Sequence, residues 1–408
     1  GGMTAPGYRR MLTLENSLER GMPAPAQGAL LHEGFTFGPF GSWLADWFAA
    51  LVSDGISMIA QALANWGVAE WVQNLLVNGV LTGVGSVISF LPTIVILFLL
   101  LSILEDSGYM ARAAFLMDKP LRKIGLNGRA FIPMMMGFGC TVPAVMSARS
   151  MNTQRDRRFT IMLTPFMSCG AKVPIYALFT RAFFGGNQVL VMSVFYLVGI
   201  LMAVVAGLIL KRFMFHGDAS PFLMELPKYR LPTVRNVARE LWDKASGFVK
   251  RAFTVIFLAT LVVWFLQSFT FSLQAAPNVE ASMLGSIAGL IAPIFVPAGF
   301  GNVAASTAVL TGIMAKESVV STLAVIAGVD SQSAQMLTAI RGVFPSSLAA
   351  VSFLLFILLY MPCVAAFAAM KREMESGRFA FFTVLSQTGL AWLVATVVYQ
   401  VGRLLGLG

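Results

Sequence analysis

Long apolar runs are the feature of this sequence that most restricts its fold. Several of them approach or exceed the roughly 20 residues that a membrane-spanning helix needs. The candidate spans are 80–104, 159–183, 189–210, 252–272, 348–370 and 379–402. Only 12% of the residues are charged and 57% are hydrophobic, whereas soluble domains contain about 25% charged residues. The sequence therefore predicts an all-α integral membrane protein that crosses the membrane several times.

Two further apolar regions, 130–148 and 284–327, are interrupted by Gly, Pro or charged residues, so neither is expected to form a straight helix. Lys and Arg are concentrated in the linking segments 105–129, 149–158, 211–251 and 371–378. The positive-inside rule then places both ends of 130–148 in the cytoplasm and both ends of 284–327 on the opposite side. The net charge of +10 reflects Lys and Arg clustered in these segments, a pattern that sets the topology and does not indicate a nucleic-acid partner.

The order of span, hairpin, span and span occurs twice, in opposite orientations. The tetrapeptides FMSC (166–169) and YMPC (360–363) occupy the same place in the two halves. Two inverted-topology gate repeats, each with a re-entrant hairpin and broken helices, are typical of transporters. The predicted divisions are a disordered polar segment 1–39, amphipathic interfacial helices 40–78, a first gate repeat 79–210, a basic cytoplasmic linker 211–251 and a second gate repeat 252–408.

All three cysteines, Cys140, Cys169 and Cys363, lie beside helix-breaking residues in apolar surroundings. An odd number of buried cysteines argues against a disulfide framework. One buried cysteine is usually a small packing residue, but three beside helix breakers favour a site for a soft metal ion such as Fe(II), Zn(II) or Cu(I). The residues expected to loosen these helices are Gly137, Gly139, Pro143, Gly170, Pro174 and Pro362.

Charged residues within apolar runs are costly and often functional. Glu317 and Glu105 are candidate metal ligands, although a structural role for Glu317 has equal weight. The structural alternative is that Lys316 and Lys172 pair with these acidic side chains, and it is the favoured role for Lys172. Neighbours such as Lys316 and Glu317 do not share a helix face, so each needs a separate partner. Secondary candidates for the site are Asp106, Met167, Met361 and Lys316.

Several kinds of catalysis have no support in the sequence. The two histidines, His32 and His216, lie outside the apolar runs, which argues against a histidine-rich zinc enzyme. No lysine is followed by Ser or Thr, so the phosphate-binding loop that ends in Gly-Lys-Ser/Thr is absent. We therefore expect a transporter domain that is not an enzyme and that binds no nucleotide.

Four long segments resemble the membrane domain of the bacterial ferrous iron transporter family FeoB. They are LEDSGYMARAAFLMDKPLRKIGLNGRAFIPMMMGFGCTVPAVMSAR, TPFMSCGAKVPIYALF, AKESVVSTLAV and LLYMPCVAAFAAMKRE, and the resemblance extends over residues 80–405. It implies uptake of Fe(II), as the transported ion, across the bacterial inner membrane through paired gate repeats akin to those of nucleoside carriers. It also implies that Cys140, Cys169 and Cys363 line the gate, with Glu105 as a neighbouring acid.

The same resemblance implies a set of partners. They are the lipid bilayer, a GTP-binding domain normally in the same polypeptide, small cytoplasmic Feo accessory proteins and a second copy of the chain. Family members carry a GTP-binding domain, a helical regulatory segment and a first spanning helix before the region that matches 40–78, and none of the three is evident in this sequence.

Two alternative functions remain open. A carrier of an organic solute, such as a nucleoside, would need Asn, Gln and Ser at the hairpin tips, where this chain has mainly Cys, Gly and Pro. A membrane enzyme without transport activity is less favoured, because the sequence contains no Ser/His pair, HExxH motif or paired intramembrane aspartates.

Overall fold

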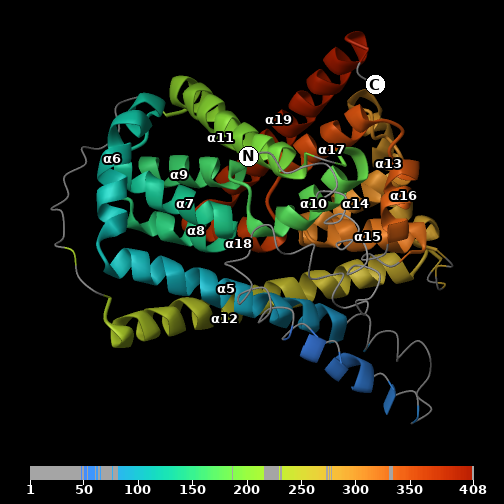
Figure 1. Cartoon of the computed structure of the whole chain (residues 1–408), viewed down its shortest axis with the longest axis horizontal. Helices are drawn as coiled ribbons and strands as arrows, with labels where there is room; N and C mark the ends of the chain where they lie inside the picture. Colours follow the sequence, from blue (N-terminus) through green and yellow to red (C-terminus); the bar gives the residue numbers. More distant parts are fainter. Residues whose placement is uncertain are drawn as a thin grey trace, which may run out of the picture.

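The computed structural model describes residues 81–185, 187–215, 232–272, 278–329 and 334–406, together with Tyr229, Gln274, Ala276 and scattered positions between 47 and 76. The predicted polar segment 1–39 and most of the predicted interfacial helices 40–78 lie outside the described residues, as do both histidines. The regular elements of the described part are helices (Figure 1), which confirms the predicted all-α class.

Seven α-helices form the first half of this part. They are α5 (Thr82–Asp106), α6 (Tyr109–Ile124), α7 (Phe131–Gly139), α8 (Thr141–Ser147), α9 (Gln154–Leu163), α10 (Val173–Phe183) and α11 (Gln188–Phe213). The second half contains α12 (Val234–Ser268), α13 (Met283–Phe295), α14 (Val303–Met314), α15 (Ser318–Ala327), α16 (Ala334–Val343), α17 (Ser347–Leu359), α18 (Val364–Glu373) and α19 (Gly377–Leu404).

Four helical segments among the described residues are long and apolar enough to cross a membrane. They are Gln154–Phe183, which includes α9 and α10, then α11, then Ser347–Glu373, which includes α17 and α18, and finally α19. The bent pair Met283–Ala298 and Val303–Met314 gives up to five such segments. The chain is therefore a multi-pass membrane protein.

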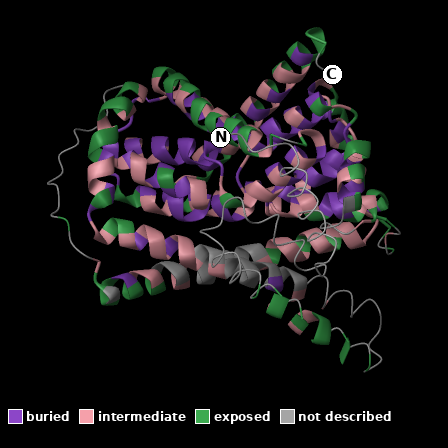
Figure 2. Cartoon of the chain, viewed as in Figure 1, coloured by how far each residue is buried: buried purple, intermediate pink, exposed green. Residues whose placement is uncertain are grey.

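Two of the interrupted spans are largely buried, whereas two continuous ones are largely exposed. The apolar windows of Gln154–Phe183 and Ser347–Glu373 are 72% and 78% buried, whereas those of α11 and α19 are each 22% buried. Figure 2 shows the buried residues gathered around α7, α9 and α17, with exposed residues along α11 and α19. An interrupted helix leaves backbone N–H and C=O groups without partners, so it is stable at membrane depth only where protein covers it.

A cluster of stacked and edge-on aromatic rings supports the breaks in the second half. Phe353 of α17 contacts Phe179 of α10 and Phe300 before α14, with ring centroids 5.3 Å apart in both pairs. Phe356 stacks on Tyr360 with centroids 5.0 Å apart. Such pairs add about 0.5–1.5 kcal/mol each beyond their burial. The two contacts of Phe353 hold the middle of α17 against α10 and the segment before α14.

The structure differs from the sequence prediction in two helical regions. The predicted hairpin 284–327 is three helices, because α13 and α14 meet at 105° and a further break separates α14 from α15. The predicted basic linker 211–251 is helical from Val234, where α12 begins. α12 packs along α5, and the two lie side by side at the lower edge of Figure 1.

The two halves share a local backbone pattern. α6 and α13 are followed by Gly125 and Gly299, whose φ angles of 93° and 87° favour glycine. The next helices, α7 and α14, end at Cys140 and Ala315, whose φ and ψ angles are −152° and 132° in one case and −144° and 131° in the other. In the first half α8 follows Cys140 at once, whereas in the second half two residues separate Ala315 from α15, which begins at Ser318. α7 and α8 pack against each other across Cys140.

Three arginines join residues 149–158 to the turn between α18 and α19. We call this group the arginine clasp. Its contacts are Arg149 with Glu373 (Nε–Oε2 2.6 Å, and Nη2 with Oε1), Arg157 with Glu375 (2.8 Å) and Arg158 Nε with the Met374 carbonyl (3.2 Å). The clasp ties together segments that are far apart in the sequence.

Candidate functional site

Each cysteine stands where a helix is interrupted. Cys140 is the one residue between α7 and α8, Cys169 precedes the short 3-10 helix η5 (Gly170–Lys172), and Cys363 precedes α18. All three have extended backbone angles, which end the helical hydrogen-bond ladder at these points. The Gly and Pro residues beside them explain locally why the helices break there.

The three breaks approach one another in space. The Cys140 thiol interacts electrostatically with Cys363, Cys169 and Glu317, and the Cys363 thiol interacts with Cys169 and Glu317. Cys140 and Cys363 also pack against one apolar cluster that includes Val142. All three thiols are half-buried and free of disulfides. The structure therefore brings Cys140, Cys169, Cys363 and Glu317 into one neighbourhood.

These side chains do not form a closed metal cage. Within the ranges that the structure describes, no three His, Cys, Asp or Glu side chains are placed to hold one metal ion together. An ion in this neighbourhood would need other ligands besides the thiols, and backbone carbonyls at the breaks are the nearest chemical class. Carbonyl oxygen is a harder ligand than thiolate, so a set of thiols and carbonyls would combine soft and hard ligands.

Small residues allow α7 to approach the break before α10. A Cβ at Gly137 would lie 3.1 Å from the Cβ of Met167, and one at Gly170 would lie 3.5 Å from the Gly139 carbonyl oxygen. A side chain at Gly139 would clash with Leu97. Gly137 and Gly139 thus permit close packing next to Cys140.

The three prolines predicted to loosen helices occupy different places. Pro143 is buried in the first turn of α8, Pro174 lies in the first turn of α10, and Pro362 lies in the break between α17 and α18. The first turn of a helix tolerates proline because the missing N–H has no partner there. Among the three, only Pro362 stands between two helices.

Two buried lysines contact the break between α17 and α18. Lys172 Nζ donates a hydrogen bond to the Leu358 carbonyl at 2.7 Å, and Lys316 Nζ donates to the Met361 carbonyl at 2.8 Å. Lys316 Nζ also lies 3.1 Å from the centroid of the Tyr360 ring. The expectation that these lysines pair with acidic side chains is therefore wrong, because carbonyls freed by the break are their partners.

The two acids at the end of α5 are placed differently from Glu317. Glu105 is exposed in the last turn of α5. Asp106 accepts a hydrogen bond from the backbone N–H of Thr233 at 3.0 Å, just before α12 begins. Asp106 therefore joins the end of α5 to the start of α12, a structural role that the sequence analysis did not assign.

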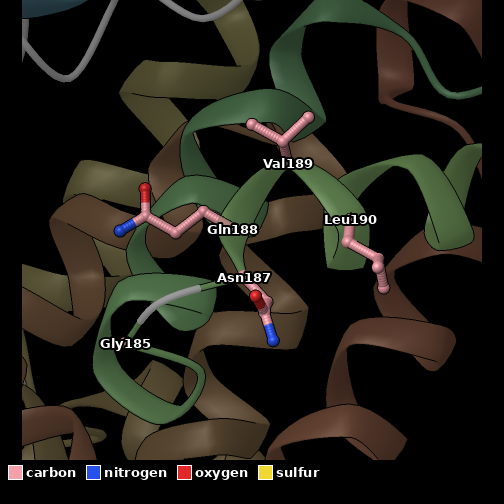
Figure 3. A pocket seen from close by; sticks show the side chains of 5 residues that line it. All are labelled: Gly185, Asn187, Gln188, Val189 and Leu190. Atoms are coloured by element: carbon pink, nitrogen blue, oxygen red, sulfur yellow. The ribbon is translucent and has the colours of Figure 1, made fainter. Parts of the chain in front are cut away.

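The surface hollow between α10 and α11 is lined by none of the cysteines and none of the other candidate ligands. Figure 3 shows its lining, which is Gly185, Asn187, Gln188, Val189 and Leu190. These residues belong to one short loop and the first turn of α11. This hollow is therefore not the site.

These features define a class of protein, a helical membrane domain whose core consists of interrupted spans. Residues 87–183 and 249–377, more than half of the chain, match the Gate family, described as nucleoside recognition. The chain therefore belongs to the Gate family. Residues 192–244 match the family described as ferrous iron transport protein B C terminus. Together the matches identify the membrane domain of the ferrous iron transporter family FeoB, which confirms the resemblance noted in the sequence.

Relatives with FeoB names cover most of the chain. It is 39% identical over 370 residues to an Fe(2+) transporter FeoB from Staphylococcus aureus (strain MSSA476), covering 90% of this chain and 55% of that protein. It is 37% identical over 383 residues to an Fe(2+) transporter FeoB from Salmonella paratyphi A, covering 81% and 50%.

A third relative is a fusion protein. It is named Fe(2+) transport protein A/Fe(2+) transporter FeoB fusion protein, comes from Porphyromonas gingivalis (strain W83), and is 34% identical over 449 residues, covering 97% of this chain and 52% of that protein. The chain thus spans about half the length of the curated relatives it matches. No solved structure matches it.

Proposed function

We propose that this chain carries Fe(II) across the bacterial inner membrane along a path that passes the three interrupted helices. The observation that carries the proposal is that Cys140, Cys169 and Cys363 each lie at a helix break and interact with one another. The FeoB names of the relatives support Fe(II) as the transported ion.

The ligand chemistry supports the same ion. Thiolates favour Fe(II) over Mg(II) or Ca(II), which prefer oxygen ligands. Conduction also requires that the ion leave its site, so a loose set of thiols, Glu317 and carbonyls suits transport better than a closed cage. Met167 and Met361 precede Cys169 and Cys363 by two residues, and they are proposed as secondary ligands. Glu105 is proposed as an acid near the cytoplasmic entrance.

We also propose that the two halves are inverted repeats with re-entrant hairpins. The matching backbone angles at Cys140 and Ala315, and the positive φ angles at Gly125 and Gly299, support this proposal. The basic segments on the proposed cytoplasmic side support the opposite orientations of the halves. This architecture would place the breaks of both halves near the membrane midplane.

The partners are proposed from the relatives. The fusion protein supports an interaction with a small accessory protein of the transport protein A type. The chain matches only about half of its relatives' length, so we propose that a GTP-binding domain acts together with this membrane domain. This chain itself is proposed to bind no nucleotide, and assembly with a second copy is part of the same proposal.

Uptake into proteoliposomes tests the transport function. Under anaerobic conditions, vesicles that contain the chain and an entrapped iron-quenched dye are expected to lose fluorescence faster than empty vesicles when Fe(II) is added outside. Mg(II) at the same concentration should cause no flux, because it prefers oxygen ligands and sheds its water reluctantly. Equal rates with and without the protein would contradict the proposed function.

The Gate family description keeps one alternative open, a nucleoside-type carrier. The same vesicles, given radiolabelled uridine, distinguish the two functions. Flux of uridine without flux of Fe(II) would favour the organic-solute carrier. The half-buried thiols at the breaks favour the metal ion.

A labelling scan tests the proposed orientation. In a chain without native cysteines, Asn278→Cys is expected to react with an impermeant maleimide only from outside the cell, and Asp243→Cys only from the cytoplasm. Both residues are exposed; Asp243 lies in the first part of α12, and Asn278 lies beyond the end of that helix. The positive-inside rule gives the two sides. Labelling of position 278 from the cytoplasm alone would rule out the inverted-repeat arrangement.

A further inference from the structure

Lys172 and Lys316, which lie at two separate helix breaks, both contact the break between α17 and α18. Lys172 lies in η5, after Cys169, and Lys316 lies between α14 and α15. Each is only 3% exposed. Their amino groups bind the carbonyls of Leu358 and Met361, which lie on either side of Tyr360 at the break between α17 and α18.

The sequence of the break explains why these two carbonyls are available. In a continuous helix the Leu358 carbonyl would accept a hydrogen bond from the N–H of residue 362, but residue 362 is proline and has no N–H. Met361 lies after α17 and before α18, so its carbonyl belongs to neither helical ladder. A buried carbonyl without a partner is costly, and each lysine removes that cost.

The contacts around Lys316 fix its amino group in place. The Tyr360 ring lies under Nζ at 3.1 Å from the centroid, and an aromatic face attracts a cation or an N–H donor. The Tyr360 hydroxyl donates to the Val309 carbonyl at 3.4 Å. Gly312 leaves no room for a side chain next to that hydroxyl. The lysine and the tyrosine thus form one packed unit across the break.

The same carbonyls are the groups that a cation leaving its water would use. Rings and pairs of freed carbonyls replace the hydration shell of ions in membrane pathways. A lysine amino group that is hydrogen-bonded to such a carbonyl takes the place that a permeating cation would occupy, so it blocks the carbonyl from the ion. The two amino groups also interact electrostatically with each other and with Cys169 and Cys363, so they border the cysteine neighbourhood.

We propose that Lys172 and Lys316 are positioning residues that keep the break between α17 and α18 closed, and that a permeating cation reaches the Leu358 and Met361 carbonyls only when the two amino groups leave them. The inference rests on the proposed function for the identity of the ion. The closed state, in which both lysines are hydrogen-bonded to these carbonyls, exists in the chain without any ion.

Alkylation of Cys363 tests the closed break without any transport measurement. Purified Lys172→Met and Lys316→Met variants keep the side-chain length but lose the donor. N-ethylmaleimide is expected to modify their Cys363 at least about tenfold faster than in the parent protein, since loss of one buried hydrogen bond shifts an opening equilibrium by about that factor. Mass spectrometry of the Cys363 peptide gives the rate.

The matched control is Lys211→Met. Lys211 Nζ also donates to a carbonyl, that of Lys123 at 3.2 Å, but at an exposed position. Its removal should leave the Cys363 rate unchanged. Lys172→Arg and Lys316→Arg keep a donor and should restore slow alkylation. Rates within about twofold of the parent in folded Met variants, or Arg variants that react as fast as Met variants, would overturn the proposal.

A measurement on the unmodified chain covers the case in which the Met variants do not fold. Reductive methylation of Lys172 and Lys316, relative to Lys211, should increase when Fe(II) is added anaerobically, because the ion displaces the amino groups. Unchanged methylation in a protein that takes up Fe(II) would overturn the inference and leave the proposed function intact. Fast Cys363 alkylation in the Met variants, combined with no Fe(II) uptake by the parent protein, would overturn the proposed function and leave the closed break intact.

Discussion

Replacing Cys140 by serine is expected to lower Fe(II) uptake by at least about tenfold, the lower end of the effect that perturbing a metal's supporting ligands has. A hydroxyl is nearly the same size as a thiol, so packing between α7 and α8 should change little. It is a harder and poorer ligand for Fe(II), so affinity and selectivity should change more. Cys169→Ser and Cys363→Ser, as the related pair in the two halves, should follow with smaller losses.

The measurement is the initial rate of Fe(II) entry into proteoliposomes, together with the metal content of the purified protein. Met146→Leu is the matched control, because Met146 packs against the same apolar cluster as Cys140 and stands away from the break. If Cys140→Ser and Cys169→Ser both keep normal uptake and metal content, the cysteines are packing residues. Glu317, Glu105 and the carbonyls of the breaks would then be the remaining ligands.

Replacing Arg149 by methionine is expected to destabilise the protein by about 1–3 kcal/mol, the cost of leaving a buried polar group without its partner. The Glu373 side chain is 4% exposed, whereas Arg149 is 47% exposed. The variant therefore leaves the Glu373 carboxylate buried without its guanidinium partner. Because water hardly reaches this carboxylate, solvent screening offsets little of the cost. The checking measurement is the thermal unfolding midpoint in detergent.

Arg122→Met is the control for that variant. Arg122 pairs with Asp118 at 2.6 Å, one helical turn away, and the two side chains are 43% and 18% exposed. Surface pairs of this kind contribute only about 0.3–0.5 kcal/mol. If the unfolding midpoint falls as far in Arg122→Met as in Arg149→Met, the arginine clasp stabilises the protein no more than an exposed ion pair does. The double variant Arg149→Met/Glu373→Met should recover part of the loss.

The clasp also predicts a direction of pH dependence. The hydrogen bond from Arg157 holds the pKa of the exposed Glu375 carboxyl below its usual range. A carboxyl with a lowered pKa in the folded state contributes stability above its unfolded pKa, and that contribution is lost as the pH falls through the folded value. Acidification should therefore weaken the link between α9 and the turn after α18, and high salt should weaken it further.

The sequence identifies the break positions better than their contacts. Cys140 stands among glycines, and Pro362 directly precedes Cys363, so a local rule locates these interruptions. The sequence predicted that 284–327 is interrupted, but not that it divides into three helices with a bend of 105° between α13 and α14, because Gly and Pro mark a possible break without fixing its angle. The early start of α12 was missed because a charged segment is compatible with either linker or helix.

The sequence gives almost no local signal of which residues pair over long range. Lys172 and Leu358, like Arg149 and Glu373, are joined only after the whole chain has folded. The sequence suggested acids for the lysines because opposite charges are the usual partners of buried ones. The proline at 362 is the one clue that a carbonyl at 358 lacks its donor, and it could have indicated a lysine partner in advance.

The burial of the interrupted spans, against the exposure of α11 and α19, has a mechanical consequence. A bilayer that is too thick or too thin tilts or strains the helices that touch lipid. In this protein α11 and α19 are continuous helices with only 22% of their apolar windows buried, and they can tilt as rigid rods without losing hydrogen bonds. Membrane thickness should thus act on the outer helices first, while the thiols and carbonyls at the breaks are insulated from hydrophobic mismatch.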